Sequence, residues 1–407
     1  MEALFVDQNN AILKLRWFKV GALFMEPGTG KTRAAYEIVK RAFECDYILW
    51  LTPFQTKQNL RDELKKWYLN DNVRHGEFDR LFDVVGIETM SNSDRVYLEL
   101  ILKLDKSSCP FIVVDESLKI KNWDAKRTKR IIELGKRAHF KLVLNGTPLS
   151  KNLLDIWAQM EFLSPKILKM GLTEFKNTFC EWTKITRRIG NRSFTKEFIT
   201  KYHNVDHLYS LIGHYVYECD LELEIGKQYH DVAYKIEDDI KEQYHYLKAK
   251  YLNDEKLQAM NNNIFLELTQ KMQHLYCISE EKYDLVREIL NTNDPSQVIA
   301  FTKFIASGDK LRALFPGITV LSYGKHAHGL NLQQFNVCIF FDKTWDYAQR
   351  IQSEARIYRK GQKNQCIFYD LTGDVGLESM ISKNIEKKQG LLEYFKSKAV
   401  KEILNEL

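Results

Sequence analysis

Short β-forming runs alternate with helical patterns along this chain, and they do so in two separate stretches. Apolar runs joined by helices are typical of parallel sheets that are covered on both faces. A chain of 407 residues is also too long for one ordinary core. We therefore predict an α/β protein with two parallel sheets flanked by helices. The predicted strands are Ala22–Met25, Tyr47–Leu51, Asp83–Val85, Phe111–Val114 and Lys141–Leu144, then Gln297–Phe301, Ile318–Leu321, Val337–Phe341 and Cys366–Leu371.

The segment between the two stretches has a different character. Residues 164–226 lack the alternation and are rich in aromatic and basic side chains such as Trp182 and Arg187. We interpret residues 166–226 as a helical insertion and linker, between a first domain at 1–165 and a second at 227–407. The tail from Leu377 to Leu407 has the amphipathic pattern of one or two helices.

Composition excludes several classes of protein. Hydrophobic residues make up 44% and charged residues 28%, with 7 Pro and 19 Gly, so the chain is neither collagenous nor wholly disordered. No apolar run reaches the roughly 18 residues of a membrane span, and residues 1–10 lack a basic and then apolar leader. The seven cysteines are widely spaced and odd in number. We expect an intracellular, cytoplasmic protein without a membrane partner or a cysteine metal site.

Charge permits a polyanionic partner without requiring one, because the net charge is only +6. Basic residues do cluster within positions 119–130. Such a run forms either a phosphate-contacting surface or an ordinary solvated helix face. The clustered residues are Lys119, Lys121, Lys126, Arg127, Lys129 and Arg130.

A glycine-rich turn, MEPGTGKT at residues 25–32, follows the first predicted strand and precedes a helical pattern. Gly28 and Gly30 allow the backbone N–H groups to face phosphate oxygens. Lys31 offers a charge to the β and γ phosphates, and the Thr32 hydroxyl offers a ligand to Mg²⁺. The turn departs from the usual pattern in having Met25 where Gly is common, and a chance glycine turn is the alternative. We interpret it as a phosphate-binding loop.

Two carboxylates, Asp115 and Glu116, follow the apolar run Phe111–Val114. Asp115 can hold Mg²⁺ through water, and Glu116 can orient or deprotonate an attacking water. Acidic pairs at strand ends also occur as simple caps. Combined with the phosphate-binding loop, however, this pair predicts hydrolysis of a nucleoside triphosphate, with ATP and Mg²⁺ as cofactors.

Three segments in order along the chain resemble motifs of the Swi/Snf-like branch of superfamily-two helicases. They are DESLKIKN from Asp115, LNGTPL from Leu144 and QSEARIYRKGQ from Gln352 to Gln362. The resemblance covers nearly the whole chain. It implies two RecA-like lobes, ATP in the cleft between them and duplex DNA across the top.

The resemblance also assigns nucleotide-site residues. Arg356 and Arg359 resemble the arginine pair that reaches the γ-phosphate from the second lobe, where a guanidinium neutralises charge in the transition state. Gln8 resembles the glutamine that reads adenine, with an exposed polar residue as the alternative. The remaining residues implied at the nucleotide are Glu26, Thr29, Gly329, Asn331 and Gln352.

The same resemblance implies loops that contact the phosphate backbone of double-stranded DNA without reading its sequence. They follow predicted strands in both halves of the chain. The residues implied are Thr52, Lys57, Thr89, Lys121, Thr302, Lys303, Lys325 and Trp345.

These features predict a DNA-dependent ATPase that translocates on double-stranded DNA, as a minimal, monomeric member of viral or bacterial type. A strand-separating helicase is one alternative, and it would need a wedge, for which the segment from Phe175 to Tyr202 is the place to look. A nucleotide-gated DNA clamp is the other. DNA-stimulated ATP turnover separates the motor from the clamp.

Overall fold

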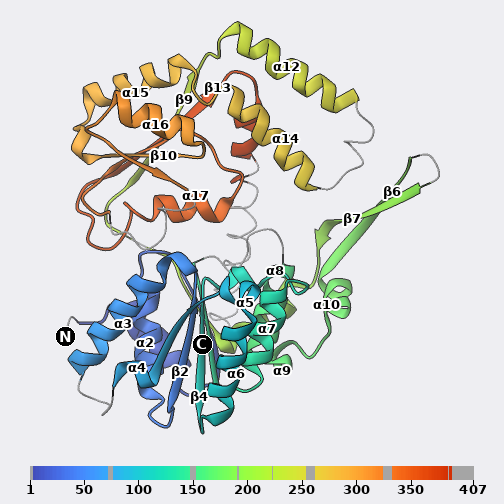
Figure 1. The fold of residues 1–407 in the computed structure, drawn as a ribbon, viewed down its shortest axis with the longest axis vertical. Coiled ribbons are helices and arrows are strands. Elements are labelled where there is room, and N and C mark those ends of the chain that lie inside the picture. The colour runs from blue at the N-terminus through green and yellow to red at the C-terminus, as the bar shows by residue number, and fades with distance from the viewer. Residues whose placement is uncertain are drawn as a thin grey trace. The chain divides into compact units, whose positions relative to one another are not determined.

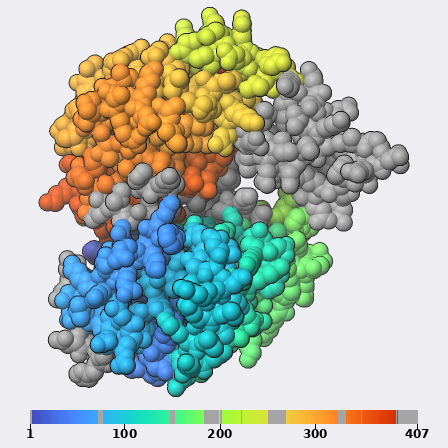
Figure 2. All heavy atoms as spheres, in the orientation of Figure 1, coloured from blue at the N-terminus to red at the C-terminus, as the bar shows by residue number. Residues whose placement is uncertain are grey.

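The computed structural model, drawn in Figure 1, describes residues 3–71, 77–146, 153–189, 192–221, 223–253, 262–323, 332–383 and 385–386. The described residues fall into two units. One lies within Met1–Glu181 and Tyr202–Glu222, and the other within Trp182–Lys201 and Leu223–Gln389. Figure 2 shows the closely packed atoms of the first unit in blue to green and those of the second in yellow to red.

A six-stranded sheet, in which every pair of neighbours is parallel, forms the centre of the first unit. Its spatial order is β3-β2-β4-β5-β1-β8. The strands are β1 (Val20–Met25), β2 (Tyr47–Thr52), β3 (Phe82–Gly86), β4 (Pro110–Asp115), β5 (Phe140–Asn145) and β8 (Val216–Cys219). The carboxyl ends of β1 and β4 therefore lie at the same edge of the sheet, where ligands of open α/β sheets bind.

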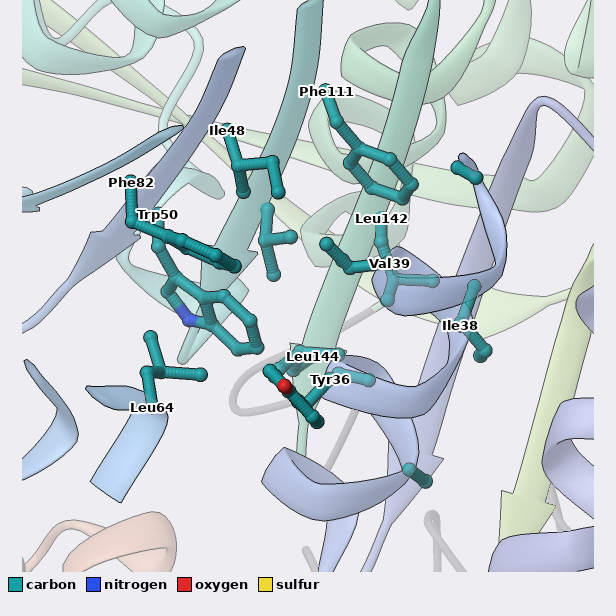
Figure 3. Close-up of a cluster of buried hydrophobic side chains, with 14 of the residues drawn as sticks. Tyr36, Ile38, Val39, Ile48, Trp50, Leu64, Phe82, Phe111, Leu142 and Leu144 are labelled. Atoms are coloured by element: carbon teal, nitrogen blue, oxygen red, sulfur yellow. The ribbon is translucent and has the colours of Figure 1, made fainter. Parts of the chain in front are cut away.

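Helices cover this sheet because their apolar faces pack on its buried strands. Figure 3 shows Tyr36 and Val39 of one helix facing Ile48 and Trp50 of β2 in a cluster of buried apolar side chains. The helices are α1 (Val6–Leu15), α2 (Lys31–Arg41), α3 (Lys57–Asp71), α4 (Phe78–Leu81), α5 (Thr89–Asn92), α6 (Asp94–Lys106), α7 (Lys126–Gly135) and α8 (Leu154–Leu163), with 3₁₀ turns at Phe54–Thr56, Ser117–Ile120 and Gly213–Tyr215.

The insertion contains helices, as expected, and also a two-stranded ribbon that the sequence analysis did not predict. Its helices are α9 (Pro165–Leu168), α10 (Leu172–Phe179) and α11 (Val205–Ile212). The ribbon joins β6 (Cys180–Ile189) to β7 (Arg192–Tyr202), and neither strand pairs with another sheet. Both strands are rich in β-branched and aromatic residues, which favour strands over helices.

A second parallel sheet, in the order β11-β10-β12-β13-β9, forms the centre of the second unit. Its strands are β9 (Lys227–Tyr234), β10 (Val298–Thr302), β11 (Thr319–Ser322), β12 (Val337–Phe340) and β13 (Cys366–Gly373). The helices are α12 (Asp238–Asn253), α14 (Asn262–Leu275), α15 (Glu280–Thr292), α16 (Ile305–Leu314) and α17 (Tyr347–Glu354), with a 3₁₀ turn at Pro295–Gln297.

The α/β class with two helix-flanked parallel sheets is confirmed, and every predicted strand overlaps an observed one. Of the predicted C-terminal helical segment, residues 377–383 are helical, while residues 387–407 lie outside the described part of the chain. None of the described helices is both long and apolar enough to cross a bilayer.

The cysteines are far apart in sequence, yet two of them meet in space. The Sγ atoms of Cys45 and Cys109 lie 3.5 Å apart, and both side chains are buried. All seven cysteines are free thiols. Spacing along the chain therefore did not reveal this pair, because a sheet can bring residues from different loops together.

Candidate nucleotide site

The phosphate-binding loop connects the end of β1 at Met25 to the start of α2 at Lys31. Gly28 has a φ of 94° and Gly30 a φ of 82°, conformations that only glycine adopts without strain. The Thr29 hydroxyl donates to the Glu26 carbonyl oxygen at 2.7 Å, which stabilises the turn. The loop thus leads into the N-terminus of α2, and the backbone N–H groups and positive dipole end of a helix N-terminus attract anions.

The acidic pair at the end of β4 lies beside this loop. Lys31 Nζ is 3.4 Å from Glu116 Oε1, although the two residues are 85 positions apart. The Glu116 N–H donates to Asp115 Oδ1 at 2.9 Å. Glu116 has a φ of 50°, which is unfavourable for a residue with a side chain and is typical of functional sites. The two predicted motifs therefore form one site in the first unit.

Asp115 has an unusual environment. Burial, together with the negative charge of Glu116, raises the pKa of Asp115 to about 6, against the opposing effect of Lys31. Thr52 Oγ1 lies 3.5 Å from Asp115 Oδ2. Burial makes the negatively charged form of Asp115 unfavourable, and a divalent cation bound beside it would stabilise that form.

The residues present fit Mg²⁺. Asp115 and Thr32 supply hard oxygen ligands of the kind Mg²⁺ prefers. The described residues include no cluster of three or more His, Cys, Asp or Glu able to hold a metal by themselves. Mg²⁺ often takes only one or two protein ligands, because phosphate and water supply the others.

Gln8 is buried rather than exposed, with 3% of its surface accessible. Its Nε2 donates to the Gly30 carbonyl oxygen at 3.2 Å, and its Oε1 accepts from the Phe5 N–H at 2.9 Å. The alternative of an exposed polar residue is therefore wrong. Contact with adenine stays a prediction.

Two contacts that the sequence did not indicate restrain the loop. Glu26 Oε2 accepts from the Leu221 N–H at 2.9 Å, and the Glu26 N–H donates to the Cys219 carbonyl at the same distance. At the end of β5, a Cβ on Gly146 would lie 2.7 Å from Pro27 Cδ, so only glycine fits there. Thr147 and Pro148 lie outside the described residues.

In the second unit, Gln352 lies in α17, and Arg356 and Arg359 lie half-buried in the turn that follows it. Gln362 closes this turn, because its Nε2 donates to the Phe335 carbonyl at 2.7 Å and to the Ile357 carbonyl at 3.2 Å. Gly329 and Asn331, also predicted at the nucleotide, lie outside the described residues.

Among the candidate DNA-contacting residues, Thr52 and Thr302 are buried at strand ends. Thr52 Oγ1 is hydrogen-bonded to Thr56 Oγ1 at 2.9 Å. Lys303 Nζ donates to Gln273 Oε1 at 2.9 Å, and burial lowers the pKa of Lys303. In this structure neither threonine is accessible to a phosphate.

The other candidates are only partly buried. They are Lys57, Thr89, Lys121 and Trp345. Lys121 Nζ is 3.8 Å from an oxygen of Asp155, and Trp345 packs against the core of the second unit. Lys325 lies outside the described residues. Their role at DNA stays a prediction.

The basic run at 119–130 consists of residues with partners inside the protein. Lys126 Nζ lies 3.0 Å from Asp94 Oδ1, and Arg127 Nε donates to the Lys119 carbonyl at 2.9 Å. Arg130 also pairs with Asp94. These contacts favour a network of ion pairs over a dedicated phosphate-binding surface.

Glu88 is a structural residue whose role the sequence analysis missed. Its Oε1 pairs with Lys119 Nζ at 2.8 Å, and its Oε2 accepts from the Phe54 N–H at 2.9 Å. Despite burial, these hydrogen bonds lower the pKa of Glu88. Glu88 thus links the loops that follow β2, β3 and β4. The only sequence signal is its place just after a predicted strand.

The sequence of this chain is similar to those of several known proteins. Residues 21–285, more than half of the chain, match the SNF2-related domain. The chain is 24% identical, over an alignment 456 positions long, to the Saccharomyces cerevisiae "Transcription regulatory protein SNF2", covering 90% of this chain and 26% of that protein. It is 22% identical to a Mycoplasma pneumoniae "Uncharacterized ATP-dependent helicase", covering 91% and 40%.

Among solved structures, the chain is similar to the "Sulfolobus solfataricus SWI2/SNF2 ATPase core in complex with dsDNA", at 18% identity and a TM-score of 0.44, covering 98% of this chain and 94% of that one. The chain spans well under two thirds of the two curated relatives.

Proposed function

Because this chain belongs to the SNF2-related domain family of helicase-like ATPases, we propose that it uses ATP hydrolysis to translocate along double-stranded DNA. The observation that carries the proposal is the 3.4 Å approach of Lys31 to Glu116, beside Asp115. It unites a phosphate-binding loop with an acidic pair suited to hydrolysis.

In this proposal Lys31 has two partners, Glu116 and the phosphates of a bound triphosphate. When a triphosphate occupies the loop, Lys31 turns to the β and γ phosphates and releases Glu116. Glu116 then accepts a hydrogen bond from the attacking water and orients it. Thr32 and Asp115 would hold Mg²⁺, which would neutralise part of the phosphate charge.

Arg356 and Arg359 complete the proposed machinery from the second unit. Each guanidinium would neutralise charge that develops on the γ-phosphate in the transition state. Neither unit alone contains both the phosphate-binding loop and the arginines. Hydrolysis would therefore require the units to close on each other, and reopening afterwards would move them along the duplex.

DNA would be held through its phosphate backbone by the loops after the strands, so binding would be independent of sequence. The test is ATP turnover measured with duplex DNA, single-stranded DNA and RNA, beside displacement of a third strand from a triplex. We expect duplex DNA to stimulate turnover and ATP to drive triplex displacement. If duplex DNA left ATP turnover unchanged at salt concentrations that preserve DNA binding, the result would instead indicate a nucleotide-gated DNA clamp.

The β6–β7 ribbon favours strand separation as a second candidate function. Its two strands pair with each other and with neither main sheet, as Figure 1 shows, and a hairpin of this kind can act as a wedge. A forked duplex is the test. If the protein unwinds the fork and a variant with residues 183–200 replaced by a short glycine-serine turn does not, the ribbon separates strands. If neither protein unwinds the fork, the second candidate is wrong.

A further inference from the structure

We propose that Arg350 is a positioning residue that holds the arginine turn, residues 355–362, in the orientation needed for hydrolysis. The inference rests on the proposed ATPase function and adds a residue to it. Arg350 lies in α17, four residues before the helix ends at Glu354. The arginine turn follows directly and carries Arg356 and Arg359.

The guanidinium of Arg350 uses all three of its nitrogens. Nη1 and Nη2 donate to the two carboxylate oxygens of Asp370, on β13, at 2.5 and 2.7 Å. Nε donates to Glu354 Oε1 at 2.8 Å. The guanidinium carbon also lies 3.5 Å from the ring centroid of Phe340, on β12. One side chain of α17 is thereby fixed to two strands of the sheet.

A third strand restrains the same group. Glu354 Oε2 accepts from the Tyr229 hydroxyl of β9 at 2.8 Å. Lys227, also on β9, lies 3.8 Å from Glu354 Oε2 and 4.3 Å from the ring centroid of Tyr358. Tyr358 stands between the two arginines in the sequence, so β9 contacts both the end of α17 and the turn itself.

Backbone hydrogen bonds join this cluster to the arginine turn. The carbonyl of Glu354 accepts from the N–H groups of Ile357 at 3.2 Å and Tyr358 at 3.0 Å. The N–H of Arg356 donates to the Ser353 carbonyl at 3.2 Å. Glu354 is therefore both a partner of Arg350 and the residue from which the turn starts, so a rotation of α17 would carry the arginines with it.

The energetics favour a role in orientation over one in net stability. The side chains of Arg350, Glu354 and Asp370 are 14%, 7% and 16% exposed, so the group is largely desolvated. A desolvated ion pair contributes little net stability compared with apolar packing, but a planar guanidinium bound at two points permits only one geometry. Reacting groups need such precision, since a misplacement of about 1 Å can cost about 10²-fold in rate.

The experiment combines Arg350→Lys with Arg359→Ala in a double-mutant cycle, with ATP hydrolysis measured at saturating duplex DNA. Lysine keeps the charge but loses the two-point contact. We expect Arg350→Lys to lower kcat by about 10-fold to 10²-fold, with KM for ATP nearly unchanged because the phosphate-binding loop is in the other unit. In the Arg359→Ala background Arg350→Lys should lower kcat hardly any further, because both substitutions remove the same function, the action of a correctly positioned Arg359.

Val286→Ala is the matched control for stability. Val286 lies on α15, is fully buried in the core of the second unit and belongs to neither α17 nor the site. It should lower the thermal midpoint yet leave kcat at the parent value well below that midpoint. If Arg350→Lys does not fold, Asp370→Asn replaces it, because its carboxamide still accepts one hydrogen bond from Arg350.

The outcomes separate the two claims. If the chosen variant hydrolyses ATP at the parent rate, the positioning role is wrong. The role is also wrong if the variant lowers kcat by the same factor in the parent background and in the Arg359→Ala background. If the parent protein does not hydrolyse ATP, or hydrolyses it equally well with Lys31→Ala, the proposed ATPase function itself is wrong.

Discussion

The carboxylate of Glu26 accepts a hydrogen bond from the backbone N–H of Leu221 at 2.9 Å, although the two residues are 195 positions apart in the chain. Glu26 is the first residue of the phosphate-binding loop after β1. Leu221 follows β8 and directly precedes the part of the chain that enters the second unit at Leu223. The loop that would receive the nucleotide is thus hydrogen-bonded to the connecting segment.

Replacing Glu26 with alanine should weaken this connection. We expect Glu26→Ala to lower the free energy of unfolding by roughly 1–2 kcal/mol, since the buried N–H of Leu221 loses its acceptor. It should also reduce the stimulation of ATP turnover by duplex DNA more than it reduces turnover without DNA. Chemical denaturation and steady-state turnover check both effects. Glu26→Gln keeps an acceptor oxygen and is the control. If duplex DNA stimulated ATP turnover equally in the parent protein and in Glu26→Ala, the hydrogen bond to Leu221 would not link the loop to the response to DNA.

Lys31→Ala should abolish most ATP turnover while sparing DNA binding. Lys31 is the charge in the loop that would meet the β and γ phosphates, and losing such a group costs about 10²-fold or more in rate. Duplex affinity should stay within a small factor of the parent value, because the proposed DNA contacts lie in other loops. Turnover and fluorescence anisotropy with labelled duplex are the measurements. Turnover at the parent rate would show that the loop is not the site.

Arg359→Ala should lower the rate of hydrolysis far more than the affinity for ATP. An arginine that acts only on the transition state contributes about 10³-fold to 10⁵-fold, whereas ground-state binding would depend on the loop of the first unit. Single-turnover hydrolysis gives the rate, and titration with a fluorescent ATP analogue gives the affinity. Arg359→Lys is the conservative comparison. A variant that bound ATP weakly but hydrolysed it normally would exclude the assigned role.

Glu88→Gln should reduce stability in a pH-dependent manner. The pKa of Glu88 is lowered in the folded protein, so its contribution is present above the unfolded-state pKa and is lost as the pH falls through the lowered value. At pH 7 we expect a loss of about 1 kcal/mol, a modest figure because the side chain is 33% exposed. Urea unfolding of the parent protein and of Glu88→Gln, at pH 7 and at successively lower pH, measures the difference between their free energies of unfolding. If this difference did not become smaller in acid, the explanation would be wrong.

The central strands of both sheets were predictable because they are apolar on both faces. Tyr47–Thr52 and Val298–Thr302 are buried along their whole length, so burial alone produces an uninterrupted apolar run. The phosphate-binding loop was predictable for a similar reason. Its function needs glycine, lysine and threonine at fixed spacing, so the loop can be identified from its own short sequence.

The other elements depend on partners that are distant in the chain. Strand β9 is largely exposed along its first half, so its sequence lacks the apolar run of a central strand. Strand β8 has four residues and pairs with β1, almost two hundred positions earlier. The contact between Arg350 and Asp370 likewise depends on the register of α17 on the sheet, which local periodicity does not reveal.

The late position of β8 in the chain has a consequence for synthesis. The last strand of the first unit's sheet, β8, is synthesised only after the ribbon and α11. Until then β1 is an edge strand, and its backbone groups on the β8 side have no strand to pair with. A fragment that stopped after α8 would keep that edge permanently. Exposed edges of this kind recruit strands from other molecules, so such a fragment should aggregate, whereas one that extends through Cys219 should remain dispersed.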